Sequence, residues 1–321
     1  MSLPTLEDIK KAQQQIEGQV HQTPIMLSST LDKMTGLKLF LKAENFQKTG
    51  SFKARGALNA LLNLTEEQSK KGVIAVSAGN HASGVAWAAK KSNISAIVVM
   101  PETASQNKIA AVRSYGAEIV LHGVSIIEAI SHMEKLRAER AFTLVHPSDD
   151  FYVISGAGTL GLELLEQVKD LDNIIVPVGG GGLISGIAIA VKRLSPKTKV
   201  FGVEPWGANA MYRSLEAKCK VALEKMNTVA DGLCLPTVGE LTYAAVSKYV
   251  DEIVCVSDEE IKKAMRLLLE RCKLVVEPSG AAGLAALLAH KLPSAPNLKT
   301  AVVLSGGNVD LSLIASLQSI V

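Results

Sequence analysis

The sequence of 321 residues has few aromatic residues and almost no excess of either charge. Phe, Trp and Tyr make up 4% of it, whereas Ala, Val, Ile, Leu and Gly are abundant. Small and β-branched side chains suit parallel strands that are covered by helices. The 34 basic and 31 acidic residues give a net charge of +3, and no basic cluster with interleaved aromatics occurs. We therefore expect no nucleic-acid partner.

Cysteines and long apolar runs are also scarce. The four cysteines, Cys219, Cys234, Cys255 and Cys272, contain no C-x-x-C pair, so neither a disulfide framework nor a zinc site is expected. No apolar run reaches the roughly 18 residues of a membrane helix. The first residues lack the apolar core of a signal peptide. These features predict a cytoplasmic protein that has no membrane partner.

Short apolar runs alternate with segments in which apolar residues recur every three or four positions, such as 109–115, 125–138 and 259–271. This alternation predicts an α/β protein built from βαβ units with mostly parallel sheets. The length suggests about two domains, although no linker rich in Pro, Gly and Ser marks a boundary. The predicted strands are 37–43, 73–76, 96–100, 118–121, 143–146, 173–178, 199–203, 252–256 and 300–304.

Ligands in such sheets bind beyond the C-terminal ends of the strands. Four predicted strands are followed by distinctive loops, which are SAGNH at 77–81, GGGG at 179–182, EPWGANA at 204–210 and SGGN at 305–308. The four glycines precede a predicted helix, where free amides and the helix dipole favour a phosphate. A flexible turn rarely needs four consecutive glycines, because each one costs backbone entropy.

Lys53 lies in the segment KTGSFKARG, which enters a predicted helix with Ser51 as its N-cap. The helix dipole opposes a cation in this first turn and favours the neutral amine that imine chemistry needs. An isolated lysine is usually a solvated surface charge, but the phosphate loop and the polar loop at 77–81 favour a functional role. In that loop, amides could hold a carboxylate, Asn80 could donate to a phenolic oxygen, and His81 suits a supporting contact better than acid–base chemistry.

Two further motifs are less specific. Ser305 could bond a ring heteroatom, but a plain strand-to-helix turn explains the SGGN segment equally well. The glycines of GAGTLG at 156–161 match the dinucleotide motif G-x-G-x-x-G, which would suit a nicotinamide-dependent oxidoreductase. This copy lies in mid-chain without the acidic residue expected about 20 positions later. Packing of a helix on a sheet is the better explanation for it.

Six segments together resemble the serine/threonine dehydratase family of pyridoxal-phosphate enzymes, most closely its short catabolic threonine deaminases, with serine racemases as relatives. They are KTGSFKARGA, SAGNHASG, PVGGGGLISG, GVEP, VEPSGAAG and LSGGNVDL, and the resemblance covers about residues 5–315. It implies fold type II, with two open parallel-sheet α/β domains similar to the tryptophan synthase β subunit and the cofactor in the cleft between them. The larger domain would comprise 1–50 and 150–321, and the smaller one 51–149 with its core in 75–148.

The resemblance also implies roles for individual residues around pyridoxal 5′-phosphate. Lys53 would hold the cofactor as a Schiff base and remove the substrate's Cα proton, and Phe52 would lie beside the ring. Asn80 would bond the phenolic oxygen, and Ser305 the pyridine nitrogen, which it leaves neutral, unlike an aspartate partner. The phosphate would be held by Gly179, Gly180, Gly181, Gly182 and Leu183. The substrate carboxylate would be held by Ser77, Ala78, Gly79, Asn80 and His81.

The implied reaction converts L-threonine, and L-serine, to a 2-oxo acid and ammonia. Related racemases carry a serine as second base where this sequence has Ala78, which favours the lyase. The second carboxylate of their cation site is replaced by Ala210 beside Glu204, so no metal is expected. Lys48 and Thr49 match a nucleotide site at a subunit interface of relatives, so a nucleotide effector stays open.

Several expectations and alternatives accompany this reading. The chain lacks the isoleucine-binding regulatory domain of biosynthetic deaminases, which suggests a catabolic enzyme, and relatives form homodimers or homotetramers. The runner-up functions are serine racemase and 3-hydroxyaspartate dehydratase. The alternatives from other classes are the nicotinamide-dependent oxidoreductase and a non-catalytic cofactor-binding protein, against which the intact Lys53 speaks.

Overall fold

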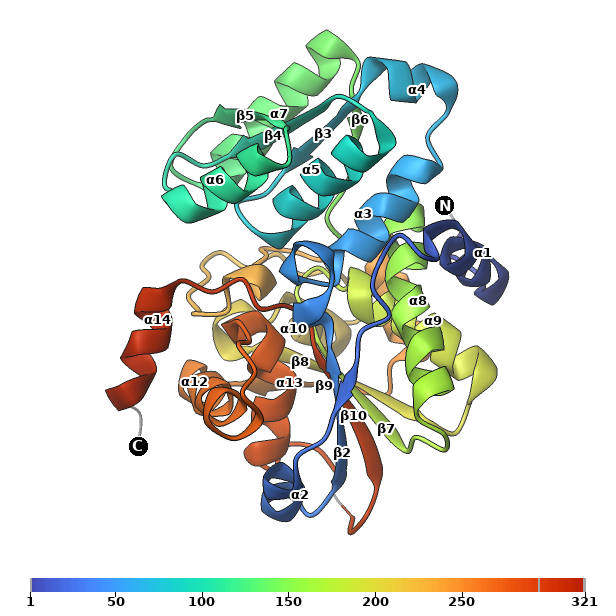
Figure 1. The fold of residues 1–321 in the computed structure, drawn as a ribbon, viewed down its shortest axis with the longest axis vertical. Helices are drawn as coiled ribbons and strands as arrows, with labels where there is room; N and C mark the ends of the chain where they lie inside the picture. Colours follow the sequence, from blue (N-terminus) through green and yellow to red (C-terminus); the bar gives the residue numbers. More distant parts are fainter. Residues whose placement is uncertain (1, 294, 320–321) are drawn as a thin grey trace.

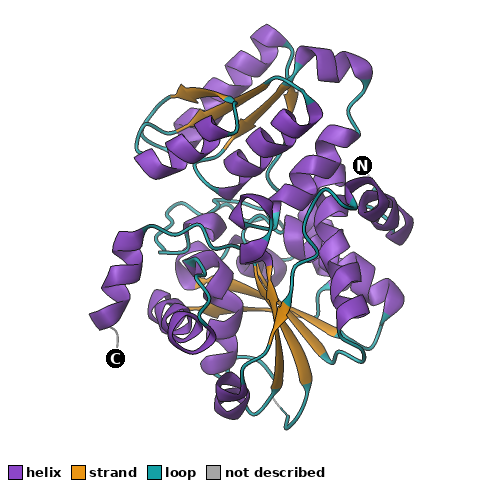
Figure 2. Ribbon diagram, in the orientation of Figure 1, coloured by secondary structure: helices purple, strands orange, loops and turns teal. Residues whose placement is uncertain are grey.

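The computed structural model describes residues 2–293 and 295–319, and its strands form two sheets that are each covered by helices (Figures 1 and 2). The six-stranded sheet has the order β1-β2-β10-β7-β8-β9, and only β1 runs antiparallel to its neighbour. Its strands are β1 (Ile25–Met26), β2 (Lys38–Ala43), β7 (Asn173–Pro177), β8 (Lys199–Pro205), β9 (Glu252–Val256) and β10 (Lys299–Leu304). The parallel α/β architecture predicted from the sequence is confirmed.

The four-stranded sheet is parallel throughout and has the order β5-β4-β3-β6. Its strands are β3 (Val73–Val76), β4 (Ala96–Met100), β5 (Glu118–Leu121) and β6 (Thr143–Leu144). All of them come from one stretch of chain, residues 73–144. The boundaries at 50/51 and 149/150 stay predictions.

Helices cover both faces of each sheet. On the smaller sheet, α7 packs against one face, and α5 and α6 pack against the other. On the larger sheet, α2, α12 and α13 cover one face, and α8 to α11 the other. The helices are α1 (Leu6–Ile16), α2 (Ser29–Thr35), α3 (Lys53–Leu62), α4 (Glu66–Lys71), α5 (Asn80–Ser92), α6 (Gln106–Ser114), α7 (Ile126–Arg140), α8 (Phe151–Gln167), α9 (Gly182–Leu194), α10 (Ala210–Ala217), α11 (Glu240–Tyr249), α12 (Asp258–Leu267), α13 (Pro278–Leu288) and α14 (Leu311–Ser316). Within the described ranges, no helix is both long and apolar enough to span a membrane.

The GAGTLG segment has a different role from the one predicted. It lies inside helix α8 rather than at a strand–turn–helix junction. A Cβ added at Gly156 would lie 2.7 Å from the carbonyl oxygen of Arg55 in α3, and one added at Gly158 would lie 2.9 Å from that of Gly186 in α9. These glycines therefore let three helices pack closely. The prediction of helix–sheet packing was wrong, and so was the dinucleotide alternative, because that motif requires a turn after a strand.

Helix α3 lies between the two sheets and contacts both α5 and α8 (Figure 1). The parallel strands β2, β10, β7 and β8 end at one edge of the larger sheet, so the loops that follow them are neighbours. The fold thus brings the start of α3 to the place where sequence analysis expects a ligand.

Candidate active site

Lys53 is the first residue of α3, and its side chain is partly exposed while its amine is surrounded by protein. The amine donates a hydrogen bond to the carbonyl oxygen of Pro147 at 2.6 Å and lies 5.0 Å from the centre of the Phe52 ring. Burial lowers the pKa of Lys53 to about 8, although the carboxyl group of Glu277 acts in the opposite direction. A much larger fraction of this amine is therefore neutral and nucleophilic near neutral pH than in free lysine.

Ser51 does not cap α3, contrary to the prediction. The N-cap residue is Phe52, and no side chain bonds the first amides of the helix. Ser51 is extended and forms a bridge with Gly306, while the Phe52 amide donates to the carbonyl oxygen of Ser305 at 3.0 Å. These backbone pairs delay the start of the helix by one residue. The Ser51 hydroxyl is left buried without a hydrogen-bond partner in the described structure.

The glycine loop connects β7 to α9 and forms a cradle of backbone. Gly181 is the N-cap of α9 with a φ of +84°, which suits glycine, and no side chain caps the helix. A Cβ at Gly180 would overlap the Ser148 hydroxyl, and one at Gly182 would lie 2.8 Å from the carbonyl oxygen of Ser148. Only glycine therefore fits here, and the open amides at the positive end of α9 suit an anion.

The loop at 77–81 ends with Asn80, the first residue of α5. The Asn80 amide donates to Glu277 at 2.6 Å, and its oxygen accepts from Asn308 at 2.7 Å. This contact joins the smaller sheet to segments that flank the larger one. The ring nitrogen Nε2 of His81 lies 2.8 Å from the carbonyl oxygen of Val145, and burial lowers the pKa of His81 to about 3. His81 is thus neutral and held by the backbone, which is a supporting contact.

Ser305 directly follows β10, the strand beside β7, so it stands next to the glycine loop at the same edge of the sheet. Its carbonyl oxygen holds the Phe52 amide, which precedes Lys53. The structure thus brings together the predicted residues at the start of α3, in the glycine loop and at the end of β10. Asn80 joins the same group through Glu277.

Three residues at the site were missed by sequence reasoning. Pro147 and Ser148 belong to the loop between β6 and α8, which looked like an ordinary connection. Glu277 lies in the segment VEPSGAAG, which contributed to the family resemblance without a role. It is the N-cap of α13, and burial, with a smaller effect of Asp231, raises its pKa to about 8. A Glu before a helix-starting Pro278 was the available signal.

A phosphate-bearing aldehyde fits this donor set. The glycine cradle offers amides to a phosphate. The amine of Lys53, with its lowered pKa, suits an imine. The unpartnered Ser51 hydroxyl lies just before helix α3, which begins with Lys53. The family model described as pyridoxal-phosphate dependent enzyme matches residues 16–306. The chain belongs to this family. Pyridoxal phosphate is accordingly its cofactor.

Three relatives of this pyridoxal-phosphate-dependent enzyme indicate the part of the family to which it is most similar. An L-threonine ammonia-lyase of Thermotoga maritima is 46% identical over 97% of this chain and 77% of that protein. A serine racemase of Dictyostelium discoideum is 44% identical over 99% of this chain and 98% of that protein. Its crystal structure matches 95% of this chain and 99% of that one with a TM-score of 0.89. An L-threo-3-hydroxyaspartate ammonia-lyase of Saccharomyces cerevisiae is 43% identical over 99% of this chain and 98% of that protein.

These similarities place the enzyme in the ammonia-lyase and racemase group of the family, with fold type II. Three activities occur at nearly equal identity, so the substrate has to be argued from the site. Glu204 and Ala210 lie at positions that match the cation site of related racemases in the sequence. In the structure, Glu204 accepts hydrogen bonds from the amides of Met211 and Tyr212 at 3.0 and 2.7 Å. Burial raises the pKa of Glu204 to about 8. That carboxyl group therefore accepts from amides in the first turn of α10.

Proposed function

We propose that this enzyme eliminates water from L-threonine and L-serine and releases a 2-oxo acid and ammonia. The observation that carries the proposal is the buried amine of Lys53, with its pKa near 8, beside a glycine cradle and a substrate loop that carries the methyl group of Ala78. A single amine can remove the Cα proton. A methyl group cannot supply the second base that racemisation requires on the opposite face of the substrate.

The residues that would hold the cofactor come from four segments. Lys53 would bind its aldehyde carbon, Phe52 would lie beside its ring, and Asn80 and Ser305 would bond its ring oxygen and nitrogen. Gly179, Gly180, Gly181, Gly182 and Leu183 would hold its phosphate. When bound, the cofactor supplies an electron sink for the charge that develops at Cα.

The chain's own groups would bind the substrate, remove its Cα proton and support the ring nitrogen. Amides of the loop at 77–81 would fix the substrate carboxylate, so that the Cα proton faces Lys53. The Lys53 amine would take that proton at Nζ, because burial lowers its pKa to about 8 and makes the neutral form more accessible than in free lysine. Ser305 supports a neutral ring nitrogen, since a hydroxyl does not impose a proton as a carboxylate does. A ring with a neutral nitrogen would be a weaker electron sink, which would suit elimination of the β-hydroxyl.

The charges around the candidate site support a substrate with a small neutral side chain. Lys108 of α6 forms an ion pair with Asp231 of the short helix η4 (Asp231–Leu233). This helix borders the glycine loop, because a Cβ at Gly179 would lie 2.9 Å from the Cα atom of Leu233. Burial opposes the charge of Lys108, yet Asp231 raises its pKa. Lys108 thus stays charged and its charge is already paired with Asp231, so a β-carboxylate as in 3-hydroxyaspartate would meet Asp231 instead of a free cation.

Steady-state assays test the proposal. The purified enzyme with pyridoxal phosphate is offered L-threonine, L-serine, D-serine and L-threo-3-hydroxyaspartate, and 2-oxo acid, ammonia and the enantiomers of serine are measured. We expect the highest kcat/KM with L-threonine or L-serine. A higher kcat/KM with 3-hydroxyaspartate would favour that lyase, and racemisation of serine faster than its deamination would favour the racemase.

A further inference from the structure

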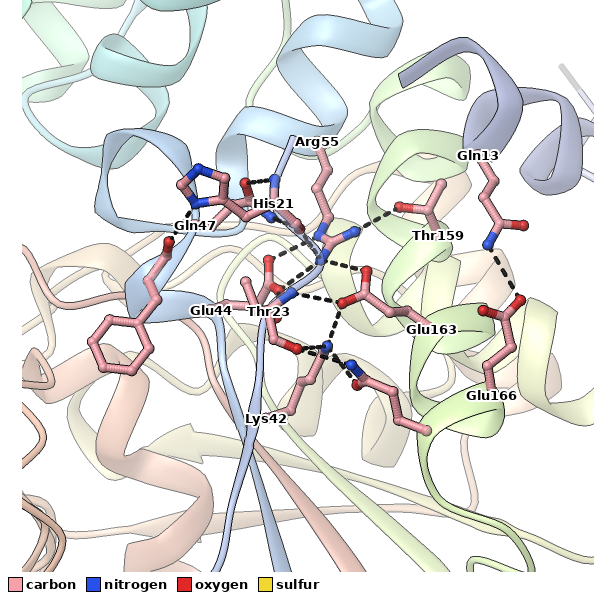
Figure 3. A network of polar contacts seen from close by, with 12 residues as sticks. Gln13, His21, Thr23, Lys42, Glu44, Gln47, Arg55, Thr159, Glu163 and Glu166 are labelled. Carbon is pink, nitrogen blue, oxygen red and sulfur yellow. Dashed lines mark hydrogen bonds and ion pairs between the residues drawn. The ribbon is translucent and has the colours of Figure 1, made fainter. Parts of the chain in front are cut away.

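Four charged side chains of alternating sign are buried between α3, α8 and the end of β2 (Figure 3). They are Lys42 of β2, Glu44 of the short helix η1 (Glu44–Phe46), Arg55 of α3 and Glu163 of α8. Arg55 donates through Nε and Nη2 to the two oxygens of Glu44 at 2.9 and 2.8 Å, and Nη2 also lies 2.8 Å from Glu163. Lys42 completes the network through its ion pair with Glu163. The proposed chemistry uses none of the four.

The network lies beside the first turn of α3, the turn that contains Lys53. Arg55 follows Lys53 by two residues, so both belong to the first turn of a helix that has no capping side chain and no acidic residue in that turn. Two cations at this positive end are unfavourable by the helix dipole. Glu44 and Glu163 supply the missing negative charge from other elements. Burial would lower the pKa of Arg55, but Glu44 and then Glu163 raise it, so the guanidinium stays charged.

The partners of Arg55 also belong to the segments that surround the Lys53 amine. Glu163 is on α8, and the loop that leads into α8 contains Pro147, whose carbonyl oxygen accepts from Lys53. Glu44 follows β2, which pairs in parallel with β10, and β10 is followed by Ser305, whose carbonyl oxygen accepts from the Phe52 amide. Arg55 thus joins the start of α3 to both sides of the candidate site through a rigid two-pronged group.

We propose that Arg55 is a positioning residue that fixes the Lys53 amine relative to the glycine cradle. This inference rests on the proposed role of Lys53 as the lysine that binds the cofactor. Arg55 is not among the residues proposed to hold the substrate or the cofactor. It acts by setting where the first turn of α3 begins and which way that turn faces.

The test compares Arg55→Lys with Lys42→Met in the full-length holoenzyme. Lysine keeps the charge of Arg55 but loses the planar fork. Lys42→Met removes a buried cation of the same network that does not belong to α3. We would measure the cofactor affinity by absorbance titration, the pH at which the imine band titrates, and the melting temperature. We expect Arg55→Lys to weaken cofactor binding about tenfold or more and to shift the imine titration, at a melting temperature similar to that of Lys42→Met.

The outcomes separate positioning from general stability. If Lys42→Met changes cofactor affinity and imine titration as much as Arg55→Lys does, or if Arg55→Lys changes neither, Arg55 has no special positioning role. An unmodified protein that forms no imine band with pyridoxal phosphate would instead overturn the proposed role of Lys53. A normal band in the unmodified protein with unchanged binding in Arg55→Lys overturns only the inference about Arg55.

A second variant covers the case in which Arg55→Lys does not fold. Glu44→Gln keeps the shape of the side chain and removes its charge, so Nε of Arg55 loses its charged partner and Nη2 keeps only Glu163 as a charged partner. We expect the same changes in affinity and imine titration, at smaller size. Hydrogen exchange of the unmodified protein adds a measurement without any substitution, because a fixed first turn predicts slow exchange at 54–57. Exchange there as fast as in the exposed helix α4 would contradict the inference.

Discussion

The amine of Lys53 donates a hydrogen bond to the carbonyl oxygen of Pro147 at 2.6 Å, although the strands of the smaller sheet lie between these residues in sequence. The chain enters the smaller sheet after α3 and returns through the loop that contains Pro147. The lysine therefore lies where the two connections between the sheets meet. This position explains its burial, and burial explains its lowered pKa.

The lowered pKa predicts how imine formation depends on pH. An amine attacks an aldehyde only when it is neutral, and Lys53, with its pKa of about 8, becomes neutral at lower pH than an ordinary lysine with a pKa of 10.5. We expect the rate at which the cofactor-free protein reacts with pyridoxal phosphate to rise about tenfold per pH unit below that value and to level off above it. Stopped-flow absorbance measures the rate. A rise that continues toward the pKa of free lysine would contradict burial as the cause.

Replacement of the lysine itself should remove both colour and turnover. Lys53→Ala lacks the amine that binds the cofactor and takes the Cα proton, so we expect kcat to fall by at least about 10³-fold. The visible absorption band should disappear, while circular dichroism stays unchanged. Lys91→Ala, in the exposed last turn of α5, is the control and should keep the band. A Lys53→Ala protein that retains an imine band would place the cofactor on another lysine.

The glycine cradle predicts a pair of substitutions that compensate each other. Gly180→Ala places a methyl group against the Ser148 side chain. Overpacking of this kind costs about 1–3 kcal/mol, so we expect cofactor affinity to fall about 5- to 150-fold. Ser148→Gly removes the obstructing side chain and should restore most of the affinity in the double variant. Absorbance titration with pyridoxal phosphate measures both. A double variant no better than Gly180→Ala would show that the loop fails for another reason.

Local sequence patterns predicted much of this fold because each strand is a short apolar run between turns. The strands 73–76, 96–100, 118–121 and 252–256 begin and end as predicted, whereas the two-residue strand β1 was missed because so short a segment carries no periodicity. The segments 109–115, 125–138 and 259–271 fall on α6, α7 and α12, and the last of these continues into a π-helical turn at Leu268–Cys272. The sequence thus predicts the elements better than their ends.

Contacts that depend on the tertiary fold escaped prediction. Ser51 looked like an N-cap from its spacing, but its bridge with Gly306, some 250 residues away, decides where α3 begins. Glu277 and Pro147 meet the other site residues only after the two sheets pack. The glycines of α8 contact helices rather than a sheet, because α3 and α9 lie against them. Each of these depends on a partner distant in sequence.

Ala78 provides a test of lyase against racemase chemistry. Ala78→Ser introduces a hydroxyl group in the substrate loop, where the family resemblance places a second base. We expect serine racemisation to rise about 10²-fold or more, with deamination reduced less, because a positioned base contributes about 10²- to 10⁴-fold. Chiral chromatography of the product measures it. Ala78→Gly is the control, since it changes the loop without adding a base. Equal racemisation by both variants would contradict the assignment.

Asp231 provides a test of substrate charge. Asp231→Asn leaves Lys108 without its ion-pair partner, so a β-carboxylate would meet a free cation at the border of the glycine loop. We expect the ratio of kcat/KM for L-threo-3-hydroxyaspartate to that for L-threonine to rise about 2- to 5-fold, a modest change because the pair is partly exposed. The gain should shrink at high salt. Glu67→Gln, which breaks an exposed pair with Lys71 on α4, should leave the ratio unchanged. A fall in the ratio for Asp231→Asn would mean that Lys108 does not face the substrate's side chain.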